Sequence, residues 1–216
     1  MSCPLARGDG LHTAALGRAV RTHIVEVDGR RDDIDVQIGP HRRVTGTVPG
    51  LYGERMVDVT YSKLDGRHLL ASWIRLVALT ARHSGTDWLA VCIGRGGRGA
   101  ETKQRVLGPP ESAADVLRDL VAMYDAGRRV PIPLPLKTSY AWAQARYSRG
   151  WPEREARFRW NTGKFPGENS QPAHELVWGR RSPVEVLMTP VRPGEECDGE
   201  KTRLGAYAAR LWLPML

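Results

Sequence analysis

Residues 46–62 read GTVPGLYGERMVDVTYS: a strand-forming run, a turn at Tyr52-Gly53-Glu54, and a second run from Met56 onward. A glycine beside polar residues between two such runs predicts a β-hairpin. Because successive side chains of a strand point to opposite faces, an acid and a lysine must stand two positions apart to share a metal ion and its water. The spacing of polar residues in this hairpin therefore decides which chemistry it can support.

The hairpin resembles that of the PD-(D/E)-x-K class of nucleases, in which the first strand carries an Asp and the second an acid-x-Lys pair. The corresponding positions here hold Pro49, Val59 and Tyr61. Val and Pro cannot bind Mg²⁺, which requires oxygen ligands. Asp58 alternates with Val57 and Val59, so its side chain is expected to face away from theirs. A one-residue slip in register would bring the acid to their face only by sending the apolar set Val57, Val59 and Tyr61 to solvent. We predict a nuclease-like scaffold without catalytic residues and without a metal site.

The rest of the chain predicts an α+β fold. The first part, residues 1–108, is predicted to be a degenerate nuclease-like core with a mixed sheet and flanking helices, incomplete at its N-terminus. Its elements are a weak helix at 11–22, strands near 22–28, 31–38, 41–48 and 55–61, a helix at 67–82 and a strand at 88–93.

The second part, residues 109–216, is predicted to be a mostly helical C-terminal subdomain packed on the core. It contains prolines suited to a first helical turn and alternating prolines that form an extended strap. Its elements are a helix from Pro110 to Gly127, a strap at 131–135, a helix capped by Thr138 or Ser139 and ending near Arg149, and helices at 152–160 and 203–212.

Positive charge is concentrated between residues 128 and 181, where eleven Lys or Arg stand against four Glu. Interleaved cations and aromatic rings can neutralise phosphates and stack on unpaired bases. The same aromatic residues can instead fill a core, while arginines solvate helix faces. The candidate DNA-binding residues are Arg146, Arg149, Arg154, Arg157 and Arg159; the aromatic residues are Tyr140, Trp142, Tyr147, Trp151, Phe158, Trp160, Phe165 and Trp178.

Two other patterns suggest different chemistry. Residues 94–99, GRGGRG, match G-x-G-x-x-G after a strand, but the segment that follows is too short and too polar for the helix of a dinucleotide site. A flexible hairpin connection is the favoured interpretation. Glu101 and Lys103 form an acid-x-Lys triplet preceded by Asp87, so a displaced metal-dependent DNA nuclease site using Asp87 and Glu101 is the alternative function.

The chain predicts a cytoplasmic protein. Its first residues contain charges and no apolar stretch, unlike a signal peptide or membrane anchor. Cys3, Cys92 and Cys197 are odd in number, far apart and without histidines at ligand spacing, which is typical of free thiols in a reducing compartment.

Several motifs in order resemble the C-terminal region of the RecC family, gamma subunits of exodeoxyribonuclease V (RecBCD), most closely of the actinobacterial type. The resemblance covers roughly residues 10–216, and RecC chains are several times longer. The motifs are VTGTVPG at 44–50, YSK at 61–63, LLASWIRL at 69–76, PIPLP at 131–135 and TSYA at 138–141.

The resemblance implies a non-catalytic DNA-binding and scaffolding part of a helicase–nuclease. Such a part acts in double-strand break repair by homologous recombination and guides the split strands. The expected partners are DNA and RecB-like and RecD-like subunits, with no membrane and no small-molecule substrate. No cofactor is expected in this chain; ATP and Mg²⁺ are expected only in partner subunits, consistent with the lack of a Walker motif.

Overall fold

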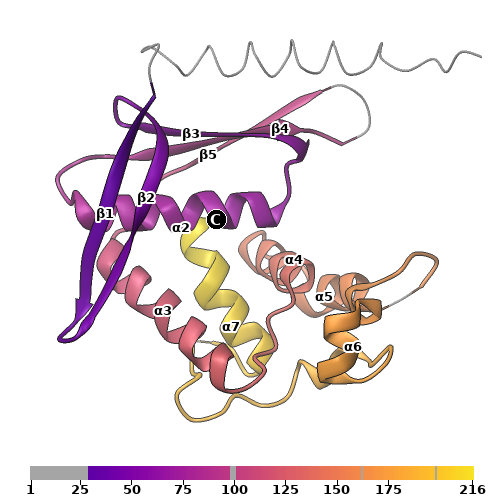
Figure 1. Ribbon diagram of the computed structural model, residues 1–216. Coiled ribbons are helices and arrows are strands. Elements are labelled where there is room, and N and C mark those ends of the chain that lie inside the picture. Colours follow the sequence, from indigo (N-terminus) through magenta and orange to yellow (C-terminus); the bar gives the residue numbers. More distant parts are fainter. Residues whose placement is uncertain (1–28, 98–100, 162, 198) are drawn as a thin grey trace, which may run out of the picture. The chain divides into compact units, whose positions relative to one another are not determined.

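The computed structural model describes residues 29–97, 101–161, 163–197 and 199–216 (Figure 1). The chain forms two compact units, the first ending at Leu117 and the second spanning Arg118–Leu216, with the boundary inside helix α3 (Ala113–Arg129). The helix expected at 11–22 and the strand expected at 22–28 lie outside the described residues. The fold class predicted from the sequence, α+β with a mixed sheet, is confirmed.

The first unit contains a five-stranded sheet in the order β1-β2-β3-β4-β5. Its β3–β4 pair is parallel and its other pairs are antiparallel. A parallel pair requires a crossover connection, which helix α2 supplies. The elements are β1 (Arg30–Gly39), β2 (Arg42–Tyr52), β3 (Arg55–Lys63), α2 (Gly66–Arg82), β4 (Leu89–Arg95) and β5 (Thr102–Leu107).

Helix α2 begins where Asp65 caps it. The Asp65 carboxylate accepts hydrogen bonds from the backbone N–H groups of Arg67 (3.1 Å) and His68 (3.4 Å), as an N-cap residue does. The helix contacts β1 and β4, and its buried residues include Trp73 and Leu76. Burial of this wide apolar face holds the sheet and the crossover helix together.

The β2–β3 hairpin is paired only next to its turn, where Leu51 pairs with Met56 and Tyr52 with Arg55. Gly50 adopts φ +73°, and a Cβ at this position would lie 2.8 Å from the carbonyl oxygen of Val57. Only glycine tolerates both the backbone angle and the close approach. The hairpin predicted from the sequence is present, but its strands separate beyond Gly50.

A hairpin connection was expected after β4, and β5 follows as its antiparallel partner, although the sequence did not assign this strand. The six residues Thr102–Leu107 pair antiparallel with β4 from Arg95↔Thr102 to Ala90↔Leu107. Most of these residues are exposed and polar, including Lys103 and Arg105. Charged residues are typical of an edge strand, which must avoid pairing with other molecules.

The second unit is helical. Its first helix beyond the boundary follows the extended proline strap, and the ends of α5 and α7 agree with the sequence-based prediction. The elements are α4 (Leu136–Tyr147), α5 (Pro152–Trp160), 3-10 helix η1 (Glu168–Ser170), α6 (Pro172–Trp178), 3-10 helix η2 (Val184–Val186), α7 (Arg203–Trp212) and 3-10 helix η3 (Leu213–Met215).

The N-terminus of α4 is capped by a residue that is distant in sequence. The prediction that Thr138 or Ser139 caps this helix is wrong, because the helix starts at Leu136 and its N-cap residue, Pro135, makes no side-chain cap. The buried carboxylate of Glu168 accepts hydrogen bonds from the backbone N–H groups of Lys137 (2.9 Å) and Thr138 (2.7 Å) instead. A negative charge at this end also suits the helix dipole.

Helix α7 is the central element of the second unit's core, with buried residues on nearly all sides. The indole N–H of Trp212 donates to the hydroxyl of Ser139 on α4 at 3.0 Å. The buried Arg203 guanidinium donates twice, at 2.7 Å each, to the Glu195 carboxylate. These bonds satisfy the polar groups that the core buries. No helix in the described part of the chain is long and apolar enough to cross a membrane.

Candidate nucleic-acid interface

Helix α5 separates buried and exposed residues cleanly. Ala156 and Trp160, four positions apart, are fully buried, and the Trp160 indole N–H donates to the carbonyl of Ser182 at 2.8 Å. Residues three and four apart share a helix face. Arg154 and Phe158 therefore lie together on an exposed face of α5.

The corner between α4 and α5 is a Schellman turn. The N–H of Gly150 donates to the carbonyl of Ala145 (2.7 Å), and the N–H of Arg149 donates to that of Arg146 (3.2 Å). Arg149 occupies the left-handed position of this motif with φ 56°, where glycine is the usual residue. The turn leads directly into Trp151, the N-cap residue of α5, whose side chain is 75% exposed.

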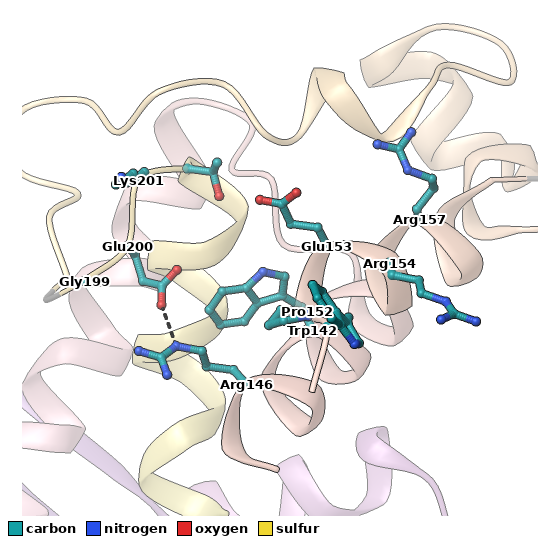
Figure 2. A pocket seen from close by; sticks show the side chains of 11 residues that line it. Trp142, Arg146, Pro152, Glu153, Arg154, Arg157, Gly199, Glu200 and Lys201 are labelled. Carbon is teal, nitrogen blue, oxygen red and sulfur yellow. Dashed lines mark hydrogen bonds and ion pairs between the residues drawn. The ribbon is translucent and has the colours of Figure 1, made fainter. Parts of the chain in front are cut away.

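A hollow of about 700 Å³ lies beside this corner (Figure 2). Its lining contains four cationic side chains and two carboxylates, so its charge is moderately positive. The cationic residues are Arg146, Arg154, Arg157 and Lys201, and the acidic residues are Glu153 and Glu200.

Two of the predicted DNA-binding arginines are already engaged in ion pairs. Arg146 contacts Glu200 at 3.1 Å, and Arg157 contacts Glu185 at 2.5 Å. The pKa of the Glu185 carboxyl is lowered by a hydrogen bond from its own backbone N–H and by one from Arg157, so the pair stays charged at neutral pH. Exposed pairs of this kind contribute little stability, yet they reduce the positive field that a phosphate would meet.

Other predicted arginines are less constrained. Within the described residues, Arg149 and Arg154 have no carboxylate partner. The Arg159 guanidinium lies 5.5 Å from the ring centre of Phe158. Of the five arginines, Arg146, Arg154 and Arg157 line the 700 Å³ hollow, whereas Arg159 lines a different hollow. The structure thus brings three of the five predicted residues together, and their contact with DNA stays a prediction.

The second hollow, of about 480 Å³, lies at the other end of α5. Phe158 and Phe165, both largely exposed, contribute to its lining together with Lys137, Arg159 and Lys164. The Lys164 ammonium lies 6.0 Å from the ring centre of Phe165. Cations next to exposed rings form a second mixed basic and aromatic surface.

The aromatic residues of this region divide between the two interpretations that the sequence left open. Trp142 and Trp160 are buried in the core, and Tyr140 packs on Trp212 with ring centres 4.8 Å apart. Trp178 is half-buried. The largely exposed rings are those of Tyr147, Trp151, Phe158 and Phe165.

The β2–β3 hairpin of the first unit presents no carboxylate at positions 49, 59 and 61. Val59 and Tyr61 are 41% and 68% exposed, and Pro49 is exposed as well. The expectation that the whole set Val57, Val59 and Tyr61 faces a core is therefore wrong; only Val57 packs against buried apolar neighbours. Asp58 does lie on the opposite face, as expected from the alternation.

The Asp58 carboxylate is directed to helix α2. It accepts hydrogen bonds from the Ser72 hydroxyl (2.8 Å) and the Arg75 guanidinium (2.9 Å). Beside it, the thiol of Cys92 is buried, and this burial raises its pKa to about 11. Asp58 is thus part of the contact between the sheet and its crossover helix.

The alternative prediction, a metal site formed by Asp87 and Glu101, is wrong because the two residues lie far apart. Asp87 precedes β4 and Glu101 precedes β5, and β4 and β5 are antiparallel, so the two residues lie at opposite ends of the same pair of strands. Seven residues of β4 separate them by roughly 20 Å. One metal ion cannot bridge that distance. No group of three metal-ligating side chains occurs in the described ranges.

Glu168, Glu185 and Glu200 were not recognised as important from the sequence. Each contacts its basic or backbone partner across 28 or more residues of chain. No local motif signals such contacts. Gly150, directly after Arg149, is a sequence sign of a helix-terminating turn at this corner.

A family model described as the RecC C-terminal domain matches residues 12–147. The chain is 56% identical over 191 residues to the RecBCD enzyme subunit RecC of Mycolicibacterium smegmatis, an alignment that covers 88% of this chain and 18% of that protein. It is 52% identical over 189 residues to the RecBCD enzyme subunit RecC of Mycobacterium tuberculosis, covering 87% of this chain and 17% of that protein. The chain thus spans less than a fifth of the length of these relatives.

Proposed function

Because this chain belongs to the RecC C-terminal domain family, we propose that it forms the non-catalytic, DNA-contacting and scaffolding part of a RecC subunit in a RecBCD-type helicase–nuclease. In this role it acts in double-strand break repair by homologous recombination. It guides split DNA strands toward the partner subunits, which are RecB-like and RecD-like. The motor and nuclease chemistry, with its ATP and Mg²⁺, belongs to those partners.

One observation carries the DNA-contacting role: the exposed face of α5 and its N-terminal corner place arginines and aromatic rings side by side. Arg149 and Arg154 have no carboxylate partner within the described residues, and Trp151 stands exposed between them in sequence. Free guanidinium groups release condensed counterions when they contact phosphates, which is the main source of affinity for DNA. Such a surface needs no metal ion and no nucleotide of its own.

The residue types in the sheet support the non-catalytic part of the proposal. The order β-β-β-α-β with a parallel β3–β4 pair is that expected of a nuclease-like core. In such a core the positions of Pro49, Val59 and Tyr61 would need two carboxylates and a lysine. Asp58, the nearest acid, is engaged with Ser72 and Arg75. We infer that this sheet serves as a rigid support.

Binding of the 216-residue chain to a fluorescent DNA at several salt concentrations tests the DNA contact. Affinity should fall steeply with salt, because each phosphate contact contributes about 0.9 to the slope of log K against log salt. Arg154→Gln should remove one phosphate contact and so reduce the magnitude of that slope by about 0.9. Arg67→Gln, which changes an exposed arginine on α2 of the first unit, is the matched control and should leave the slope unchanged. Binding that is absent even at low salt contradicts the DNA-contacting role.

Incubation of linear DNA with the purified chain and Mg²⁺ or Mn²⁺ tests the non-catalytic role. The DNA should remain intact. Degradation that disappears in Glu101→Ala would restore the nuclease alternative, whereas degradation that persists in this variant would point to a contaminant. Co-purification with RecB-like and RecD-like subunits tests the scaffolding role.

A further inference from the structure

We propose that the second hollow, lined by the end of α5 and the loop that follows it, binds an acidic peptide segment of a protein partner. The segment places an apolar side chain against Phe158 and Phe165, and its carboxylates face the cations beside these rings. This proposal rests on the scaffolding part of the proposed function and is separate from the DNA contact.

The lining of this hollow carries positive charge that the chain itself does not neutralise. Lys137, Arg159 and Lys164 have no carboxylate partner within the described residues. The one carboxylate of the lining, that of Glu168, is 3% exposed and already accepts hydrogen bonds from the N–H groups of Lys137 and Thr138 and from the Thr138 hydroxyl. Cations without a partner favour a ligand of negative charge.

Each exposed ring of the hollow stands beside one of these cations. The Arg159 guanidinium lies 5.5 Å from the ring centre of Phe158, and the Lys164 ammonium lies 6.0 Å from that of Phe165. A ligand that covers a ring therefore also meets a cation. This arrangement fits a segment that carries apolar and acidic side chains together, because covering apolar surface is favourable and the ion pairs fix its orientation.

The size and the amides of the hollow favour a peptide over a nucleic acid. A volume of about 480 Å³ encloses a group of drug size, whereas single-strand sites follow at least about four nucleotides along a groove. The side-chain amides of Asn161 and Gln171 also belong to the lining. Each amide contains a donor and an acceptor, as a peptide group does. The lining thus complements a peptide backbone and a few of its side chains.

The loop that carries Phe165 is held in place before any ligand binds. A Cβ at Gly167 would lie 2.2 Å from the carbonyl oxygen of Trp160, so this loop packs directly on the end of α5. The Ser170 hydroxyl (2.8 Å) and backbone N–H (3.2 Å) both donate to the Gly167 carbonyl. A preformed site loses less conformational entropy on binding.

Three fluorescent peptides test the proposal with the full 216-residue chain. The probe has the sequence DEDLFDED; DEDGGDED lacks the apolar side chains, and KRKLFKRK reverses the charge. Fluorescence anisotropy should show binding of the probe, about ten-fold weaker binding of the glycine peptide and no binding of the basic peptide. Equal binding of the two acidic peptides, or tighter binding of the basic one, overturns the proposal.

Variants of the hollow locate the binding. Phe165→Ala and Lys164→Glu should each weaken binding of the probe about ten-fold. Phe165→Leu should keep most of the affinity, since the contact requires an apolar side chain and no stacking face. The matched controls are Tyr124→Ala and Arg128→Glu on α3, where an exposed ring also stands beside a cation, at 5.8 Å, but lines neither hollow. The controls should bind as the wild type does. Unchanged binding in Phe165→Ala and Lys164→Glu contradicts the proposal.

A single-stranded oligothymidine separates this proposal from the DNA contact. If its binding is lost in Phe165→Ala and it displaces the peptide, the hollow is a nucleic-acid site and the proposal is overturned. If the wild-type chain binds oligothymidine but not the probe, the proposal fails and the DNA contact stands. If the chain binds the probe but no DNA at low salt, the DNA contact fails and the peptide site stands.

Discussion

The carboxylate of Glu168 accepts hydrogen bonds from both the backbone N–H and the hydroxyl of Thr138, each at 2.7 Å. These residues are 30 positions apart, and their contact fixes the start of helix α4 relative to η1 within the second unit. Because α4 ends at the corner that presents Arg149 and Trp151, this buried cap supports the candidate interface from its far end.

Glu168→Gln should lower the free energy of unfolding by about 2 kcal/mol. The glutamine side chain has no negative charge, and its NH2 group is a donor that would face the buried backbone N–H groups, which are donors too. Urea denaturation followed by circular dichroism measures the change. The control is Glu111→Gln, which makes the same chemical change at an exposed position and should stay within about 0.5 kcal/mol of the wild type. Equal stability of the two variants would contradict the capping role.

Gly167→Ala should also destabilise the second unit. A Cβ at Gly167 would lie 2.2 Å from the carbonyl oxygen of Trp160 and 2.6 Å from that of Asn161, so the backbone must shift. Overpacking of this kind costs about 1–3 kcal/mol. Gly163→Ala is the matched control, since nothing lies within 4 Å of its added methyl group. Thermal unfolding should show a lower midpoint for Gly167→Ala alone.

Arg203→Met should be among the most destabilising single changes, at about 3–5 kcal/mol, because it leaves the buried carboxylate of Glu195 without its partner. The double variant Glu195→Gln/Arg203→Met removes both charges and should recover part of the loss. Free energies of unfolding of the single and double variants form the required cycle. Additive losses would show that the two side chains do not interact.

Glu195 should also make stability depend on acid pH. Burial raises the pKa of its carboxyl. Hydrogen bonds from Arg203, from the backbone N–H of Arg192 and from Tyr207 lower the pKa by more than burial raises it, so the net pKa lies below the ordinary 4.5. A lowered pKa in the folded state stabilises the fold above pH 4.5, and this contribution is lost as the pH falls through the lowered value. Urea titrations between pH 6 and pH 3 should show a shallower decline for Glu195→Gln than for the wild type.

Cys92 should resist alkylation in the folded protein. Its burial raises the thiol pKa to about 11, so at pH 8 only about one molecule in a thousand carries the reactive thiolate. Cys197 is only half-buried and should react with iodoacetamide before Cys92 does, as mass spectrometry of the digested protein would show. Modification of Cys92 should require urea. Rapid labelling of Cys92 without denaturant would contradict the packing of α2 on the sheet.

Local signals in the sequence identified many elements. Pro152 in the first turn defined α5, and the turn at Tyr52-Gly53-Glu54 between two strand-forming runs defined the β2–β3 hairpin. These signals act through backbone angles and through side chains a few positions apart, so they are visible without the fold. Strand β5 was missed because its polar residues carry no alternation and its pairing depends on β4.

The sequence by itself determined the α+β class, the concentration of cations between residues 128 and 181, and the lack of carboxylates at Pro49, Val59 and Tyr61, because residue identity settles each of these points. Only the tertiary structure decided which cations are free. Glu200 engages Arg146 across 54 residues and Glu185 engages Arg157 across 28, whereas Arg154 keeps no carboxylate partner within the described residues. Ion pairs depend on distances of a few ångströms between side chains, and only the folded chain sets those distances.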